Sequence, residues 1–232
     1  MQKSKSNINA AEVIHLNHKS APPPARRSII MAMKTKISER TQTLVGLGML
    51  SAIILLFGLV VTPLGFPTFG PVSITTLPIP VAIGAILYGT KGGTFLGFLF
   101  GVTSFLLCLG RDSFGTLLFG INPFLTALMC IIPRTAMGAL CGLIYKAISK
   151  KSKNVAFVVA SLSAAVLNTV LFTALLLIMF GTNASVQEFL GTNSVIGVLL
   201  AIITVNAVAE AAFTTVIGGA VSKALDVARS HM

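Results

Sequence analysis

Two ionisable side chains, Arg134 and Glu210, stand inside long tracts that otherwise contain no charged residue. A charge in the middle of a bilayer costs at least about 2.5 kcal/mol, so each side chain must face the protein interior and have a partner. Two interpretations are open at this point. The two residues form a buried salt bridge with each other, or one or both of them bind a polar ligand.

Three asparagines add amide groups to these two charges. Asn206 lies four residues before Glu210 and shares its helix face, Asn168 lies in the middle of another apolar tract, and Asn122 begins the tract of Arg134. Counted at about 1.5 Å per residue from the expected outer helix ends, Arg134 and Asn206 lie about 16 Å deep and Asn168 about 20 Å deep. Each amide alone is explained by an interhelical hydrogen bond. Together they favour a binding site for a small polar solute.

The elements that position these residues follow from composition. The chain has 232 residues, 54% hydrophobic and only 10% charged, whereas soluble domains carry about 25% charged residues. One globule of this size cannot hide so much apolar surface, so lipid must be the main solvent. We predict an all-α integral membrane protein with a basic flexible tail (1–40), a helical domain (41–225) and a short C-terminal tail (226–232). Its six transmembrane helices are expected at about residues 43–61, 76–89, 92–109, 122–145, 155–180 and 195–221.

The basic residues predict the orientation of this bundle. The chain has 17 Lys and Arg against 6 Asp and Glu. In the predicted helix order all of the Lys and Arg except Arg111 and Arg134 fall on one side of the membrane. Because short cytoplasmic loops retain positive charge, both termini are expected in the cytoplasm. The basic clusters lack interleaved base-reading side chains, so nucleic acid is not an expected partner.

The uncharged loop after the first predicted helix carries Phe66, Thr68 and Phe69 among prolines and glycines. Such a stiff, amphipathic loop either covers a cavity as a lid or anchors in the membrane interface. Both interpretations stay open.

Small residues recur at four-residue spacing on two predicted helices. Gly48 and Ala52 lie on the first, and Gly93, Gly97 and Gly101 on the third. This spacing lets helices approach closely. We expect one set to serve internal packing and the Gly48/Ala52 pair to contact a partner subunit.

Motifs for catalysis or cofactor binding are missing from the sequence. No P-loop, HExxH or GxSxG segment occurs, and the three histidines lie in the terminal tails. Cys108, Cys130 and Cys141 stand in apolar runs without metal-ligand spacing, which predicts small buried side chains. We therefore expect neither an enzyme nor a metal or cofactor.

Several segments resemble the substrate-binding S components of energy-coupling factor (ECF) vitamin transporters, in their riboflavin and pantothenate branch. They are Ile-Thr-Thr-Leu-Pro-Ile-Pro at 74–80 with the glycine-rich stretch to residue 93, Asn122-Pro123, Pro133-Arg134, and the Asn206/Glu210 spacing. The resemblance covers about residues 41–225. It implies a multi-pass protein of the bacterial cell membrane that binds one vitamin with high affinity on the outer side.

The resemblance also implies partners and a substrate. An EcfT-like scaffold subunit would contact Gly48 and Ala52, two cytoplasmic ATPases would supply energy, and the loop with Phe66 would cover the ligand. Pantothenate fits best, with its carboxylate on Arg134 and its hydroxyls and amide meeting Asn168, Asn206 and Glu210. Other vitamins such as cobalamin or riboflavin, a stand-alone carrier or channel, and a purely structural subunit remain alternatives.

Overall fold

The computed structural model describes residues 24–60, 76–197, 211 and 214–230, with side chains from residue 40 to residue 224 of these ranges. All regular elements within them are helices, as predicted. They are α2 (Pro24–Leu55), η1 (Leu56–Val60), α4 (Pro78–Leu107), α5 (Ser113–Ile121), α6 (Pro123–Ile148), α7 (Lys153–Phe180), α8 (Ala184–Phe189), η3 (Thr214–Gly218) and α11 (Gly219–Ser230).

The chain forms two compact units, Met1–Leu44 and Val45–Met232. Helix α2 begins in the first unit and ends in the second. Its start at Pro24 lies well before the predicted start at about residue 43, because proline is favoured at a first helical position and good helix formers follow it. The polar composition of residues 24–40 hid this helix from a search for apolar tracts.

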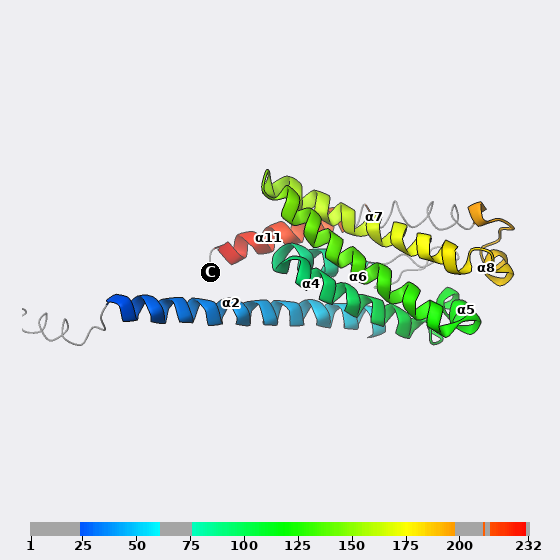
Figure 1. Ribbon diagram of the computed structural model, residues 1–232, viewed down its shortest axis with the longest axis horizontal. Coiled ribbons are helices and arrows are strands. Elements are labelled where there is room, and N and C mark those ends of the chain that lie inside the picture. Colours follow the sequence, from blue (N-terminus) through cyan, green and yellow to red (C-terminus); the bar gives the residue numbers. More distant parts are fainter. Residues whose placement is uncertain (1–23, 61–75, 198–210, 212–213, 231–232) are drawn as a thin grey trace, which may run out of the picture. The chain divides into compact units, whose positions relative to one another are not determined.

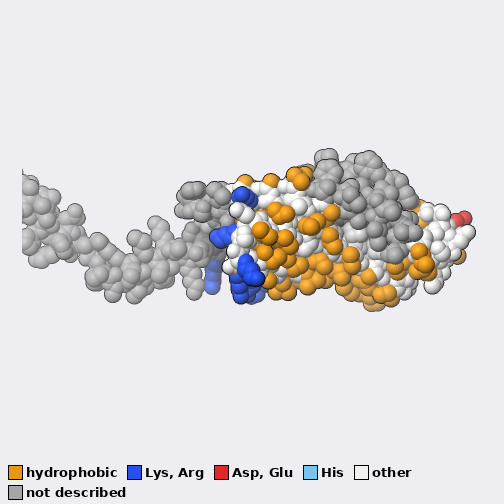
Figure 2. Space-filling model, turned by 90° about the horizontal axis from the view of Figure 1, so that it is seen from above, with side chains coloured by type: hydrophobic (Ala, Val, Ile, Leu, Met, Phe, Trp, Pro, Cys, Tyr) orange, Lys and Arg blue, Asp and Glu red, His pale blue; other side chains and the backbone are white. Residues whose placement is uncertain are grey.

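Four helical stretches of the described chain are long and apolar enough to cross a bilayer: Arg40–Val60, Pro78–Leu107, Pro123–Ile148 and Lys153–Phe180. Large apolar side chains cover their outer faces, as at Phe124 and Ile178. Figure 2 shows these hydrophobic side chains as a broad band, with Lys and Arg gathered at one end. In the unit that begins at Val45, the exposed lysines are Lys91, Lys146, Lys150, Lys151, Lys153 and Lys223.

Helix α4 is two helical segments that meet at Gly89, whose backbone is not helical (φ 73°, ψ −170°). Only glycine adopts this conformation readily. The chain folds back there, as two short distances between the segments show. A Cβ built on Gly93 would lie 2.7 Å from the Ala85 Cβ, and one built on Gly92 would lie 3.1 Å from the Gly84 carbonyl oxygen. The break agrees with the predicted boundary between two helices near Lys91.

The second segment of α4 packs against α6 (Figure 1), and glycines make this contact. A Cβ on Gly101 would lie 2.7 Å from the Ile131 Cα, and one on Gly97 would lie 3.1 Å from the Arg134 carbonyl carbon. Gly93 and Gly138 face each other with backbone against backbone. The predicted close packing at this glycine spacing is confirmed, and its partner is α6.

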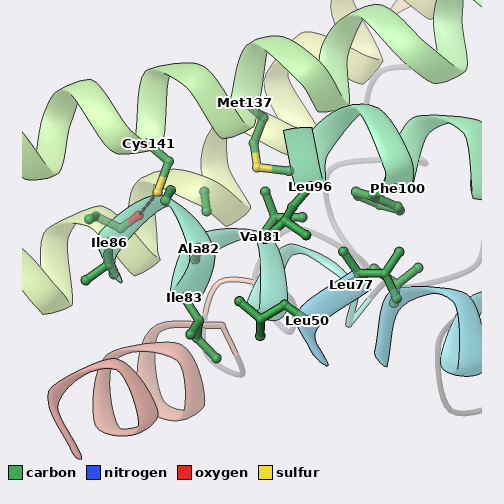
Figure 3. Close-up of a cluster of buried hydrophobic side chains, with 14 of the residues drawn as sticks. Leu50, Leu77, Val81, Ala82, Ile83, Ile86, Leu96, Phe100, Met137 and Cys141 are labelled. Atoms are coloured by element: carbon green, nitrogen blue, oxygen red, sulfur yellow. Dashed lines mark hydrogen bonds between the residues drawn. The ribbon is translucent and has the colours of Figure 1, made fainter. Parts of the chain in front are cut away.

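Two clusters of buried side chains fill the helical unit. One joins α2, both segments of α4, α6 and α7, and in it Val81, Leu96 and Met137 meet (Figure 3). The other joins the end of α4 to α5, α8 and the adjoining ends of α6 and α7. All three cysteines are buried and free, as predicted, and the Sγ atoms of Cys108 and Cys130 lie 3.8 Å apart.

Two short helices, α5 and α8, were not predicted. Each begins at a capping side chain: Asp112 Oδ2 accepts a hydrogen bond from Gly115 N (2.6 Å), and Asn183 Oδ1 accepts one from Ser185 N (3.0 Å). Beside α5, Arg111 Nη1 donates to the Leu59 carbonyl oxygen at the end of η1. Arg111 thereby links the end of the first span to the turn after α4.

Candidate functional site

Arg134 lies in the middle of α6, directly after Pro133, and is only 6% exposed. Proline has no N–H, so Pro133 cannot donate to the carbonyl of Met129 four residues earlier. The Arg134 side chain replaces that donor, because its Nη1 donates to the Met129 oxygen at 2.8 Å. One hydrogen bond thus satisfies the released carbonyl and fixes the guanidinium against its own helix.

Two aromatic rings hold the same guanidinium. Its central carbon lies 4.5 Å from the ring centroid of Phe172 on α7 and 5.6 Å from that of Phe100 on α4. A cation over an aromatic face contributes about 0.5 to 2 kcal/mol, and the contribution grows as the pair is removed from water. Phe100 belongs to one buried cluster and Phe172 packs against the other. The positive charge therefore lies where the two clusters meet.

Helix α7 carries a buried amide, Asn168, on the part of the helix that reaches this charge. Asn168 is buried and lies one helical turn before Phe172, so the two side chains share a face of α7. Two further buried hydroxyls, of Thr169 and Thr173, follow on the same half of the helix. The structure thus brings the Arg134 side chain to the part of α7 that carries Asn168.

Asn122 lies at a different level. It is the N-cap of α6, and its Oδ1 accepts hydrogen bonds from the backbone N–H groups of Phe124 and Leu125, both at 3.1 Å. Twelve residues of helix separate it from Arg134, which corresponds to about 18 Å. The side-chain oxygen Oδ1 of Asn122 therefore already caps the N-terminus of α6.

The remaining predicted residues divide into two groups. Asn206, Glu210, Phe66, Thr68 and Phe69 lie outside the described residues. Gly48 and Ala52 lie on an exposed face of α2, and a Cβ added at Gly48 would meet no atom within 4 Å.

Sequence reasoning missed the two rings and the backbone oxygen around Arg134. Weak signals were present: Phe172 follows Asn168 by four residues, and Met129 precedes Pro133 by four. Phe100 gave no such signal, because only the packing of α4 on α6 brings it to the guanidinium.

Within the described residues, long apolar helices form a membrane bundle that buries the Arg134 guanidinium between two aromatic rings, which defines the class as helical membrane proteins. Within that class, a family model described as "ECF transporter, substrate-specific component" matches residues 42–219. The chain belongs to this family and is a multi-pass membrane protein.

One curated relative is the pantothenic acid transporter PanT of Lactococcus lactis subsp. cremoris (strain MG1363). It is 29% identical over 158 residues, which cover 61% of this chain and 78% of the relative.

Proposed function

We propose that this chain is the high-affinity vitamin-binding subunit of an ECF-type importer and that its vitamin is pantothenate. The observation that carries the proposal is the Arg134 guanidinium, which is buried, held by a backbone oxygen and flanked by two rings. Such a cation suits a small carboxylate, because charge-assisted hydrogen bonds are strong and a guanidinium can bind both carboxylate oxygens. The 29% identity to a pantothenic acid transporter supports the same substrate.

In the proposed complex the pantothenate carboxylate pairs with Arg134, and its hydroxyls and amide bind to Asn168, Asn206 and Glu210. An arginine guanidinium carries five N–H donors in a fixed fork, and this fork can bind both oxygens of a carboxylate. Asn122 contributes its amide nitrogen at the outer end of α6. The loop with Phe66, Thr68 and Phe69 covers the bound vitamin.

We infer six membrane crossings with both termini in the cytoplasm. The break at Gly89 supports two helices within α4, and the exposed lysines at one end of the unit support the orientation. A cysteine introduced at Ser4 tests it, since the native cysteines are buried. It should react with a membrane-impermeant maleimide only after the cells are permeabilised. Labelling of intact cells would contradict this orientation.

The partners proposed for the chain are a membrane scaffold subunit and two cytoplasmic ATPases. Gly48 and Ala52 support the scaffold contact, because they form an exposed small-residue face that a second helix can approach closely. Liposomes containing this chain alone should take up no vitamin, whereas liposomes with the complete module and ATP should. Uptake by the chain alone would favour a stand-alone carrier.

The direct test of the substrate is a titration of the purified protein with pantothenate, riboflavin, cobalamin and pantothenol, in which an alcohol replaces the carboxylate. Pantothenate should bind with a Kd below about 1 μM, equivalent to about −8 kcal/mol. Pantothenol should bind at least about 100-fold more weakly, because it cannot pair with Arg134 as an anion. Saturable binding of none of the four would contradict the proposed function.

A further inference from the structure

Hydroxyl groups on the helices of this chain follow a common pattern from which Thr173 departs. The hydroxyls of Thr94, Thr103, Thr126 and Thr135 each donate to the backbone oxygen four residues earlier, at 2.8–2.9 Å. Thr173 Oγ1 makes no hydrogen bond to any residue of the described chain, although Thr173 is only 2% exposed. Its hydroxyl is therefore buried and has no hydrogen-bond partner among the described residues.

A buried hydroxyl without a hydrogen-bond partner destabilises a protein, because it has lost its hydrogen bonds with water. Valine has nearly the same shape and would avoid this cost. A bound molecule that supplies a hydrogen-bond partner would remove this energetic penalty at Thr173.

The position of Thr173 indicates which molecule that is. It follows Phe172, whose ring covers the Arg134 guanidinium at 4.5 Å, and it lies one turn from Thr169 on the C-terminal half of α7. Seven residues separate it from Phe180 at the end of α7, which places it about 10 Å inside the helix end. Along the helix axis, the Thr173 hydroxyl thus lies at about the same height as the Arg134 guanidinium, which would bind the proposed substrate.

We propose that Thr173 is a substrate-binding residue whose hydroxyl pairs with a neutral polar group of the vitamin, a hydroxyl or an amide, while Arg134 holds the carboxylate. This inference rests on the proposed function. It assigns Thr173 to recognition of the uncharged part of the substrate, separately from the charge.

Ser161 offers a matched control on the same helix. Its Oγ is also buried and makes no hydrogen bond within the described residues, but it lies twelve residues, about 18 Å, before Thr173. There it faces Gly218, on which a Cβ would lie 3.2 Å from the Ser161 Oγ. Within the described part of the chain, Ser161 thus carries a buried hydroxyl without a hydrogen-bond partner, as Thr173 does, but far from Arg134.

The test compares Thr173→Val, Thr173→Ser and Ser161→Ala with the unchanged chain, by pantothenate titration and by the Tm of the ligand-free protein. Thr173→Val should raise the Kd about 10-fold, which equals about 1.4 kcal/mol, while its ligand-free Tm stays equal or rises. Thr173→Ser, which keeps the hydroxyl, should bind within about 2-fold of the unchanged chain. Ser161→Ala should leave the Kd unchanged.

Three results would overturn the inference. Thr173→Val could bind pantothenate as the unchanged chain does. Alternatively, Thr173→Val and Thr173→Ser could lose affinity and ligand-free stability together, which would show a structural role. If the unchanged chain binds none of the four vitamins and analogues, the proposed function fails and this inference fails with it. If it binds riboflavin or cobalamin instead, that ligand serves in the same comparison with the same expected changes.

Discussion

Helix α6 meets its two main neighbours in opposite ways. Toward α4 it presents Gly138 and the backbone beside Arg134, and the glycines of α4 approach so closely that no side chain fits between them. Toward α7 it presents the Arg134 side chain, which lies closer to the ring of Phe172 on α7 than to the ring of Phe100 on α4. In lipid, close van der Waals packing of small residues replaces the hydrophobic effect as the force between helices. The first contact therefore makes a rigid support, and the second leaves side chains that can bind a solute.

The largest effect should come from filling the glycine contact. The Cβ of Gly97→Val would press on the carbonyl group of Arg134 and lie 3.3 Å from the Thr135 Cα. Overpacking against backbone should destabilise the protein by about 3 kcal/mol, seen as a lower Tm of the purified protein. Gly120→Val is the control, since a Cβ at Gly120 meets no atom within 4 Å. An equal Tm for both variants would contradict the rigid contact.

Removing the cation should have the next largest effect, and on binding rather than packing. Arg134→Met keeps a long apolar side chain but loses the charge and the donor to Met129. Its affinity for pantothenate should fall about 100-fold, or about 2.7 kcal/mol. Titrations with both pantothenate and pantothenol test more directly whether Arg134 binds the carboxylate. Arg134→Met should bind both equally, and a persisting preference for pantothenate would place the carboxylate elsewhere.

A smaller effect is expected from the ring that holds the cation. Phe172→Leu removes a ring whose centroid lies 4.5 Å from the guanidinium, and such a contact contributes about 1 kcal/mol. The Kd for pantothenate should rise about 5-fold. Phe95→Leu is the matched control, because Phe95 is half-exposed on the outer face of α4. A similar change of Kd in both variants would argue against a role for the ring.

The smallest effect on the fold is expected at Gly48. Gly48→Leu adds a side chain on the exposed face of α2 and should change the ligand-free stability by less than about 0.5 kcal/mol. It should nevertheless abolish co-purification with the scaffold subunit. Gly46→Leu, two residues away, should destabilise the isolated protein, because its Cβ would overlap the Tyr88 ring. A stable scaffold complex with Gly48→Leu would move the partner contact elsewhere.

The parts of the fold that sequence could predict are those that depend on one local feature. The bounds of α6 and α7 were predicted to within a few residues, since uncharged tracts and proline mark them. The break at Gly89 was also close to its predicted place. Helices α5 and α8 were missed because nine and six residues are too short for a hydropathy signal. Their capping residues, Asp112 and Asn183, were the signals that remained.

The site was less predictable, because its contacts join distant parts of the chain. A charge among apolar residues was enough to single out Arg134. Nothing in the sequence indicated that Phe100 would lie against it. The prediction for Asn122 named a ligand contact and did not include the helix-capping hydrogen bonds of its Oδ1. Asn206 and Glu210 stay predictions.

The hydrogen bond from Arg134 to the Met129 oxygen makes residues 133 and 134 epistatic. An alanine at 133 would restore a backbone N–H for that oxygen and release Arg134 Nη1 from this hydrogen bond. Replacement of Arg134 should therefore destabilise α6 more when residue 133 is proline than when residue 133 is alanine. Under the proposed function, the least costly route from an anionic ligand to a neutral one changes residue 133 first and residue 134 second.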